Sequence, residues 1–183
     1  GAIQHPDDGY IQPADLTQAM AIGARKGGAE IYRNTTVTGI ERAGDKWRVR
    51  TDKGDIMAEH VVSATGNFAR KTGEMVGLDI PVIPVEHQYI VTEPHPAIQA
   101  RQREGLPEMG VLRESDSSWY MREENGGLIL GPYDAGAPCC YVDGPDPQSE
   151  YELFQEDLDR LAPLIETAIE RVPAFGEVGI KKV

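Results

Sequence analysis

A run of short β-type segments broken by two tight turns is the feature that most constrains the fold of this chain. The run covers residues 36–62, TVTGIERAGDKWRVRTDKGDIMAEHVV, and its turns are Ala43-Gly44-Asp45 and Asp52-Lys53-Gly54. Turns of this kind join strands that lie side by side. The segment therefore predicts a three-stranded meander.

The residues before the meander predict half of an α/β crossover unit. Residues 13–26, PADLTQAMAIGARK, place apolar side chains near the helical period, with a proline early and Gly27-Gly28 at the end, so they predict a helix. AEIY, residues 29–32, then has the composition of a short buried strand. A helix, a glycine pair and a strand in this order favour a parallel sheet.

A second buried strand is predicted after the meander. The apolar run HVVSA, residues 60–64, leads into the turn Thr65-Gly66-Asn67, and the helical-looking segment FARKTGEMVGL follows at residues 68–78. Small residues at such a turn let a cofactor approach the backbone closely.

The second half of the chain has the pattern of an antiparallel sheet. Pro81 and Pro84 mark the boundary, which predicts one domain over residues 1–80 and another over residues 81–183. Four strands are expected in the second domain, at residues 85–93, 111–115, 118–124 and 128–133, with the turn Asn125-Gly126-Gly127 between the last two.

The rest of the chain predicts a loop, a helix and a final strand. Residues 135–148 are rich in glycine, proline and aspartate, which is typical of an exposed loop. Ser149 and Glu152 have the spacing of a capping box and predict the start of an amphipathic helix, which Pro163 must kink or divide. We expect its leucines to pack on the sheet and its charges to face solvent. EVGIKKV, residues 177–183, has the pattern of the start of a strand.

Composition and charge argue against several classes of partner. Among 183 residues, 30 acidic side chains oppose 18 basic ones and the net charge is −12, so no nucleic-acid partner is expected. No apolar run is long enough to span a membrane, and no membrane partner is expected. Cys139 and Cys140 are adjacent rather than spaced as CxxC, and the four histidines are scattered, so no metal site is predicted. Two reduced thiols fit a reducing, cytoplasmic location.

Six runs carry a resemblance to a known family, although no GxGxxG or Walker A phosphate loop occurs in the sequence. In order and at similar spacing they resemble the flavin-dependent amine oxidoreductases of the D-amino-acid oxidase superfamily, and in particular dimethylglycine and sarcosine dehydrogenases. The runs are DGYIQP (8–13), GARKGGA (23–29), VVSATGNFAR (61–70), IPVEHQYIVTE (83–93), SWYMREENGGLILGPY (118–133) and FQEDLDRL (154–161).

The resemblance implies that this chain is an internal part of a larger enzyme. The expected fold class is α/β (α+β), a fragment of a dinucleotide-binding α/β domain plus an antiparallel-sheet substrate domain with a flanking helix. The cofactor implied is FAD, with the glycine fingerprint and the histidine that holds FAD covalently upstream, and a possible folate-binding domain downstream. A fragment of this kind is expected to bind FAD weakly or not at all and to be inactive alone.

The resemblance also points to residues that flank the cofactor. Ala64, Thr65 and Gly66 match the family's second flavin-proximal motif, and Val37 matches a position that packs near the adenine. Read from the residues alone, the turn is an ordinary strand-to-helix connection and a valine in a β-type run is a core residue.

Three residues are implied to contact the substrate. The resemblance puts His87 in a strand that lines the pocket, and an imidazole can bind or deprotonate a substrate amine near neutral pH. Tyr120 is implied to orient the amine or carboxylate, and Arg122 is a candidate for holding the carboxylate by paired hydrogen bonds. The alternatives are a structural histidine at His87 and an ion pair of Arg122 with Glu124.

The expected function is oxidation of the N-methyl C–N bond of a glycine derivative, such as dimethylglycine or sarcosine, by an FAD-dependent oxidoreductase. Hydride leaves the methyl carbon for the flavin, and water then releases formaldehyde. The substrate expected is thus a small N-methylated amino acid. Two alternatives remain open, a glycine or D-amino-acid oxidase of the same superfamily and a binding or assembly module without catalysis.

Overall fold

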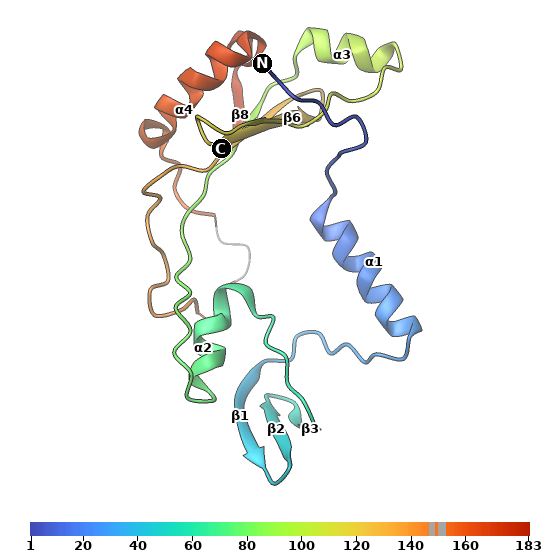
Figure 1. Cartoon of the computed structure of the whole chain (residues 1–183), viewed down its shortest axis with the longest axis vertical. Coiled ribbons are helices and arrows are strands. Elements are labelled where there is room, and N and C mark those ends of the chain that lie inside the picture. Colours follow the sequence, from blue (N-terminus) through green and yellow to red (C-terminus); the bar gives the residue numbers. More distant parts are fainter. Residues whose placement is uncertain (147–148, 150–152) are drawn as a thin grey trace. The chain divides into compact units, whose positions relative to one another are not determined.

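The structure is a computed structural model that describes residues 1–146, 149 and 153–183 (Figure 1). The chain divides into two compact units. We call residues 12–85 and 138–153 the meander unit, and residues 1–11, 86–137 and 154–183 the sheet unit. The predicted domains 1–80 and 81–183 stay a prediction.

The meander unit contains the predicted helix and the predicted meander. Its elements are α1 Pro13–Lys26, β1 Val37–Ala43, β2 Lys46–Thr51, β3 Gly54–Ala58, the 3-10 turn η1 Gly66–Phe68 and α2 Ala69–Glu74. β1, β2 and β3 form an antiparallel sheet in that order, with both turns where the sequence puts them. The bounds of α1 agree with the prediction, and Pro13 and Gly27 flank it as start and stop residues should.

The two predicted parallel strands do not form. Residues 29–32 and 60–64 belong to no strand, and Val62 is 88% exposed. A strand exists only where a neighbouring strand takes up its backbone N–H and C=O groups, and every strand pair in the described part of the chain is antiparallel. The expectation of a parallel sheet is therefore wrong for this chain, although a mixed α/β fold is confirmed.

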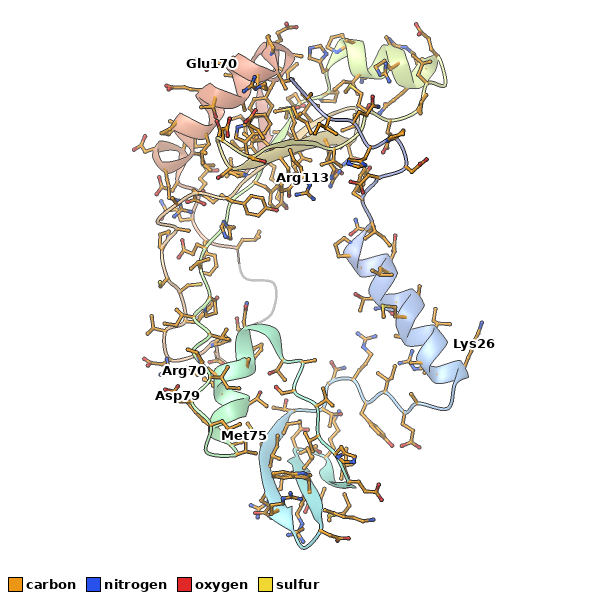
Figure 2. All side chains as sticks on the ribbon, in the orientation of Figure 1. Lys26, Arg70, Met75, Asp79, Arg113 and Glu170 are labelled. Carbon is orange, nitrogen blue, oxygen red and sulfur yellow. The ribbon has the colours of Figure 1, made fainter. Side chains whose placement is uncertain are left out.

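Helix α2 is fixed to two other segments of the meander unit. A Cβ at Gly73 would overlap the Ile80 side chain, so the helix and the segment after it are in close contact. The Arg70 guanidinium, labelled in Figure 2, donates to the Val142 carbonyl at 2.8 Å, and Lys71 Nζ donates to the Pro145 carbonyl at 2.8 Å. These bonds hold the predicted loop against the helix.

The sheet unit is a five-stranded antiparallel sheet with helices. Its strand order is β5-β6-β7-β4-β8. Its elements are β4 Ile90–Thr92, α3 Pro96–Arg103, β5 Leu112–Glu114, β6 Trp119–Glu124, β7 Gly127–Pro132, α4 Leu158–Arg171, the 3-10 turn η2 Pro173–Glu177 and β8 Ile180–Lys182. The predicted hairpin between β6 and β7 is confirmed, and Asn125 and Gly126 both have positive φ, as its tight turn requires.

One face of this sheet packs against α4 and η2 (Figure 1). The Trp119 indole is 2% exposed and donates from Nε1 to Thr167 Oγ1 of α4 at 3.1 Å. This face and its helices supply the core, which consists of Ile90, Ile98, Trp119, Met121, Leu128, Leu130, Leu161, Ala168 and Phe175.

The final helix begins later than predicted. Residues 153–157 are not helical, and the Asp157 side chain caps α4 by accepting the Arg160 N–H at 3.0 Å. Glu152 of the predicted capping box lies outside the described residues. Helix α4 continues through Pro163 without dividing, since Leu161 and Ala168 are buried against the core and offset the lost backbone hydrogen bond.

Two further differences concern β4 and α3. β4 is shorter than the predicted strand 85–93, because only Ile90 and Val91 find partners in β7 and only Val91 and Thr92 find partners in β8. Helix α3 was not expected. It begins with a proline, as many helices do, and the His95 Nδ1 accepts the Ala97 N–H at 3.1 Å as its cap. No helix among the described residues has the length and apolar character needed to cross a membrane.

Candidate functional site

The outward face of β6 carries two of the predicted substrate residues. Trp119 and Met121 are buried under α4, while Tyr120 and Arg122 alternate with them and are half-buried on the opposite face. Alternation along a strand requires this division, because successive side chains point to opposite faces of the sheet. Tyr120 and Arg122 therefore share a face, as the sequence predicts.

The ring of Tyr133 contacts the rings of both His87 and Tyr120. The Tyr120 and Tyr133 rings are tilted against each other with centroids 5.9 Å apart. The His87 and Tyr133 rings meet edge to face with centroids 6.1 Å apart. We call His87, Tyr133 and Tyr120 the aromatic row. The structure thus brings the two predicted residues to one place, by way of a tyrosine that sequence reasoning did not single out.

The position of Tyr133 follows from the end of β7. Its backbone N–H donates to the Ser118 carbonyl at 2.7 Å, which continues the β6–β7 pairing by one step beyond Pro132. Its side chain is 54% exposed. The only sequence signal is an aromatic residue at the end of a predicted strand, and that signal alone does not separate a site residue from a surface residue.

Charged groups gather behind the imidazole of His87. Its Nδ1 lies 3.4 Å from Asp134 Oδ1, and Asp134 Oδ2 lies 2.9 Å from Arg160 Nε. Arg160 has a second, more distant acidic partner in Glu86, whose Oε2 lies 3.9 Å from Arg160 NH1. Asp134 is 5% exposed at its side chain and His87 46%, so the acid is buried and the imidazole is accessible.

Arg122 already has partners in this structure. It donates to the Glu124 carboxylate at 2.6 Å and to the Glu123 carbonyl at 2.8 Å. The ring of Tyr10 lies against its guanidinium, with Arg122 Cζ 4.4 Å from the ring centroid. The ion pair with Glu124, the structural alternative considered for Arg122, is therefore present.

Tyr10 is itself held by an acid. Its hydroxyl donates to Glu108 Oε2 at 2.7 Å. This hydrogen bond raises the pKa of the Tyr10 phenol, because the carboxylate accepts the proton that ionisation would remove, and partial burial acts in the same direction. The phenol therefore stays protonated and fixed in place over Arg122.

The predicted cofactor residues lie in the meander unit. Ala64, Thr65 and Gly66 form an exposed turn, and Gly66 has φ +53°, a conformation that favours glycine. Thr65 Oγ1 is hydrogen-bonded to Ser63 Oγ at 3.1 Å and to Thr72 Oγ1 at 3.0 Å. These hydroxyls fix the turn to α2. Val37 starts β1 and is 38% exposed, so it is not a core residue.

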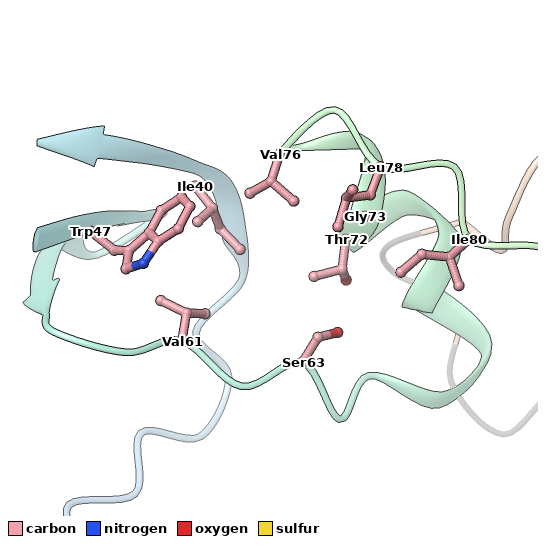
Figure 3. Close-up of a pocket in the computed structure, with 9 residues that line it drawn as sticks. All are labelled: Ile40, Trp47, Val61, Ser63, Thr72, Gly73, Val76, Leu78 and Ile80. Carbon is pink, nitrogen blue, oxygen red and sulfur yellow. The ribbon is translucent and has the colours of Figure 1, made fainter.

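An apolar pocket of about 260 Å³ lies between the meander and α2, and Figure 3 shows its walls. Ser63 and Thr72, the two partners of Thr65, supply its hydroxyl groups. Val37 and the turn 64–66 do not line it. The lining residues are Ile40, Trp47, Val61, Ser63, Thr72, Gly73, Val76, Leu78 and Ile80.

Known proteins match the chain over almost its whole length. The mitochondrial dimethylglycine dehydrogenase of Mus musculus is 40% identical over 187 residues, which cover 99% of this chain and 21% of that protein. The mitochondrial sarcosine dehydrogenase of Mus musculus is 33% identical, over 99% of this chain and 19% of that protein. The chain thus spans about a fifth of the length of these relatives.

A solved structure and a family model agree with these matches. The crystal structure of L-proline dehydrogenase from P. horikoshii superposes with a TM-score of 0.67 at 24% identity, covers 93% of this chain and 41% of that chain, and supports the fold alone. The family model described as DAO, FAD dependent oxidoreductase, matches residues 1–182. The chain therefore belongs to the DAO family of FAD-dependent oxidoreductases.

Proposed function

We propose that this chain is the part of an FAD-dependent oxidoreductase that binds a small N-methylated glycine, such as dimethylglycine or sarcosine, for oxidation at the N-methyl C–N bond. The observation that carries the proposal is the aromatic row, which gathers His87 and Tyr120 around Tyr133 on one accessible surface of the sheet unit. The similarity to dimethylglycine and sarcosine dehydrogenases supports the choice of substrate.

The turn 64–66 of the meander unit fits the close approach of an FAD. A Cβ at Gly66 would meet nothing within 4 Å, so the backbone of the turn 64–66 is open to a close approach. We propose that Ala64, Thr65 and Gly66 flank the cofactor and that Val37 contacts its adenine end. When bound, FAD accepts the hydride that leaves the methyl carbon.

His87 is the proposed base. A substrate amine must be neutral before hydride can leave the adjacent carbon, because its lone pair stabilises the developing iminium. The imidazole is accessible, and a ring nitrogen with a free lone pair can take the proton from the ammonium form. Tyr120 is proposed to orient the amine through its hydroxyl, with its ring fixed by Tyr133.

Arg122 is proposed to bind the substrate carboxylate. The guanidinium has five N–H donors in a planar fork, and only NH1 is used by Glu123 and Glu124 in this structure. A substrate carboxylate would therefore share the guanidinium with Glu124. We expect Glu124 to compete with the substrate for this charge.

The test measures flavin reduction in the full-length protein. His87→Ala and Tyr120→Phe are mixed anaerobically with dimethylglycine, sarcosine, glycine and D-alanine, and reduction is followed by the loss of flavin absorbance. The expected result is fastest reduction of the wild type by the N-methylated substrates, with a roughly hundredfold to ten-thousandfold loss in His87→Ala. His5→Ala, which changes an exposed histidine of the same unit, is the matched control.

Two outcomes would contradict the proposal. Unchanged reduction rates in both variants would remove His87 and Tyr120 from the site. Faster reduction by glycine or D-alanine than by the N-methylated compounds would assign the protein to amino-acid oxidation instead.

A further inference from the structure

We propose that Asp134 is a positioning residue that holds the imidazole of His87 with its basic nitrogen toward the substrate. The inference rests on the proposed function of His87 and concerns how that side chain is oriented. Asp134 lies in the loop directly after β7, next to Tyr133 of the aromatic row. No feature of the sequence alone distinguishes it from the other acidic residues of the chain.

The two oxygens of Asp134 have different partners. Oδ2 lies 2.9 Å from Arg160 Nε, at the start of α4, and Oδ1 lies 3.4 Å from His87 Nδ1. Arg160 is 17% exposed at its side chain, so this ion pair is largely shielded from water. The pair with Arg160 therefore fixes the carboxylate and directs its second oxygen at the imidazole.

The Asp134 carboxylate is buried and therefore needs its charged partners. The side chain of Asp134 is 5% exposed, and neither oxygen has a hydrogen bond of normal geometry among the described residues. A buried carboxylate is stable only where positive or proton-donating groups compensate for its lost hydration. Arg160 supplies one such group, and an N–H at Nδ1 of His87 supplies the other.

The carboxylate selects one form of the imidazole. With Asp134 beside Nδ1, the favoured tautomer carries its proton on Nδ1, and the lone pair is then on Nε2. The ring of Tyr133 packs edge to face against the imidazole and limits its rotation. Among the described residues, Arg160 and Glu86 are the charged groups that belong to the same set of ion pairs, and neither of them pairs with the imidazole. The accessible nitrogen is thus the one that can accept a proton from a substrate amine.

A purely structural role for Asp134 makes a different prediction. If the acid only anchored α4 through Arg160, its loss would lower stability and would not depend on His87. If it orients the imidazole, its effect on the rate requires the imidazole to be present. A double-mutant cycle separates these two roles.

The experiment compares His87→Ala, Asp134→Asn and the double variant in the full-length flavoprotein. The rate of flavin reduction by dimethylglycine is measured at saturating substrate from pH 6 to pH 10, roughly the range over which histidine and amine groups titrate. We expect Asp134→Asn to reduce the plateau rate by about tenfold to a hundredfold. We also expect its pH profile to differ from that of the wild type, because the side chain beside Nδ1 is no longer an anion. In the His87→Ala background, Asp134→Asn should have no further effect.

Glu86→Gln is the matched control. It removes the other carboxylate that pairs with Arg160 and leaves the partner of Nδ1 in place. We expect the control to keep the wild-type rate and pH profile. Asp134→Glu keeps the charge and tests rescue, so partial recovery of the rate is expected even if Asp134→Asn lowers the melting temperature.

The outcomes distinguish this inference from the proposed function. If His87→Ala is slow while Asp134→Asn keeps the wild-type rate and profile, the positioning role is wrong and the proposed function stands. If Asp134→Asn slows the His87→Ala variant as much as it slows the wild type, Asp134 acts independently of His87 and the inference is also wrong. If His87→Ala is itself as fast as the wild type, the proposed function of His87 fails first.

Discussion

The phenol ring of Tyr120 lies directly over the backbone of Gly131, its pairing partner in β7. The two residues are opposite each other in the β6–β7 register, and a Cβ at Gly131 would overlap the ring carbons of Tyr120. Only glycine at this position lets the ring cross the neighbouring strand and reach Tyr133. The geometry of the aromatic row therefore depends on a residue that has no side chain.

Gly131→Ala is expected to displace Tyr120 without removing any functional group. The added methyl must push the ring away from β7, and misplacement of a substrate-orienting group by about 1 Å can cost roughly a hundredfold in rate. We expect the rate of flavin reduction to fall by about tenfold to a hundredfold. Stopped-flow absorbance of the full-length protein measures it.

Gly179→Ala is the control for this prediction. Gly179 lies next to β8 of the same sheet, and a Cβ there would have ordinary contact with Glu93 Cγ at 3.8 Å. Flavin reduction in the Gly179→Ala variant should occur at the wild-type rate. Wild-type behaviour of Gly131→Ala as well would show that the position of the Tyr120 ring does not matter for the reaction.

Local signals predicted the hairpins and the antiparallel sheets. The turns at Gly44, Gly54 and Gly126 have positive φ, and each joins strands that the sequence separates correctly. Turn chemistry of this kind acts within a few residues, so it can be read without knowing the rest of the fold. For the same reason α1 was placed with its correct ends.

Features that depend on distant partners were not predictable in the same way. HVVSA at residues 60–64 has strand composition but no neighbouring strand to pair with among the described residues. At the site, Tyr120 and Arg122 follow from strand alternation and the family resemblance. Tyr133 and Asp134 can be identified as site residues only from the structure, which shows that the segment directly after β7 lies beside His87.

Glu124→Gln is expected to strengthen substrate binding. Glu124 is 2.6 Å from Arg122 NH1, and it competes for this guanidinium with the substrate carboxylate that we propose Arg122 binds. Removing its charge should lower the KM for dimethylglycine by about threefold to tenfold, consistent with roughly 1 kcal/mol for a partly exposed ion pair. Steady-state kinetics with an artificial electron acceptor measure this change.

Arg122→Met removes the other partner of the Arg122–Glu124 ion pair. It removes the guanidinium and keeps an unbranched apolar side chain, so KM should rise while the response to Glu124→Gln is lost. Equal KM values in Arg122→Met and in the wild type would show that the carboxylate is bound elsewhere.

Thr167→Val is expected to destabilise the sheet unit. Thr167 Oγ1 accepts the Trp119 indole N–H at 3.1 Å, and the indole is 2% exposed. Valine leaves the N–H buried without an acceptor, which costs about 1–3 kcal/mol. Urea denaturation of the full-length protein, followed by tryptophan fluorescence, measures the free energy of unfolding.

Thr17→Val is the control, because it removes a solvent-exposed threonine hydrogen bond instead of a buried one. Thr17 donates to the Pro13 carbonyl at 2.8 Å within α1, and the bond is exposed to solvent. Its loss should change the free energy of unfolding by less than about 0.5 kcal/mol. If Thr167→Val has an equally small effect, water or another group satisfies the indole.

The Tyr10–Glu108 hydrogen bond is expected to make stability depend on alkaline pH. The bond raises the pKa of Tyr10 above its ordinary value of 10.0. A group whose folded pKa is raised adds stability that is fully present below the unfolded pKa and is lost as pH rises through the folded pKa. The melting temperature of the wild type should therefore exceed that of Tyr10→Phe at pH 8, and the difference should shrink as the pH rises above 10.0, the ordinary tyrosine pKa. The two proteins differ only at residue 10, so the difference between their melting curves isolates Tyr10. A difference that stays constant from pH 8 to well above pH 10.0 would show that the hydroxyl stabilises the fold without its bond to Glu108.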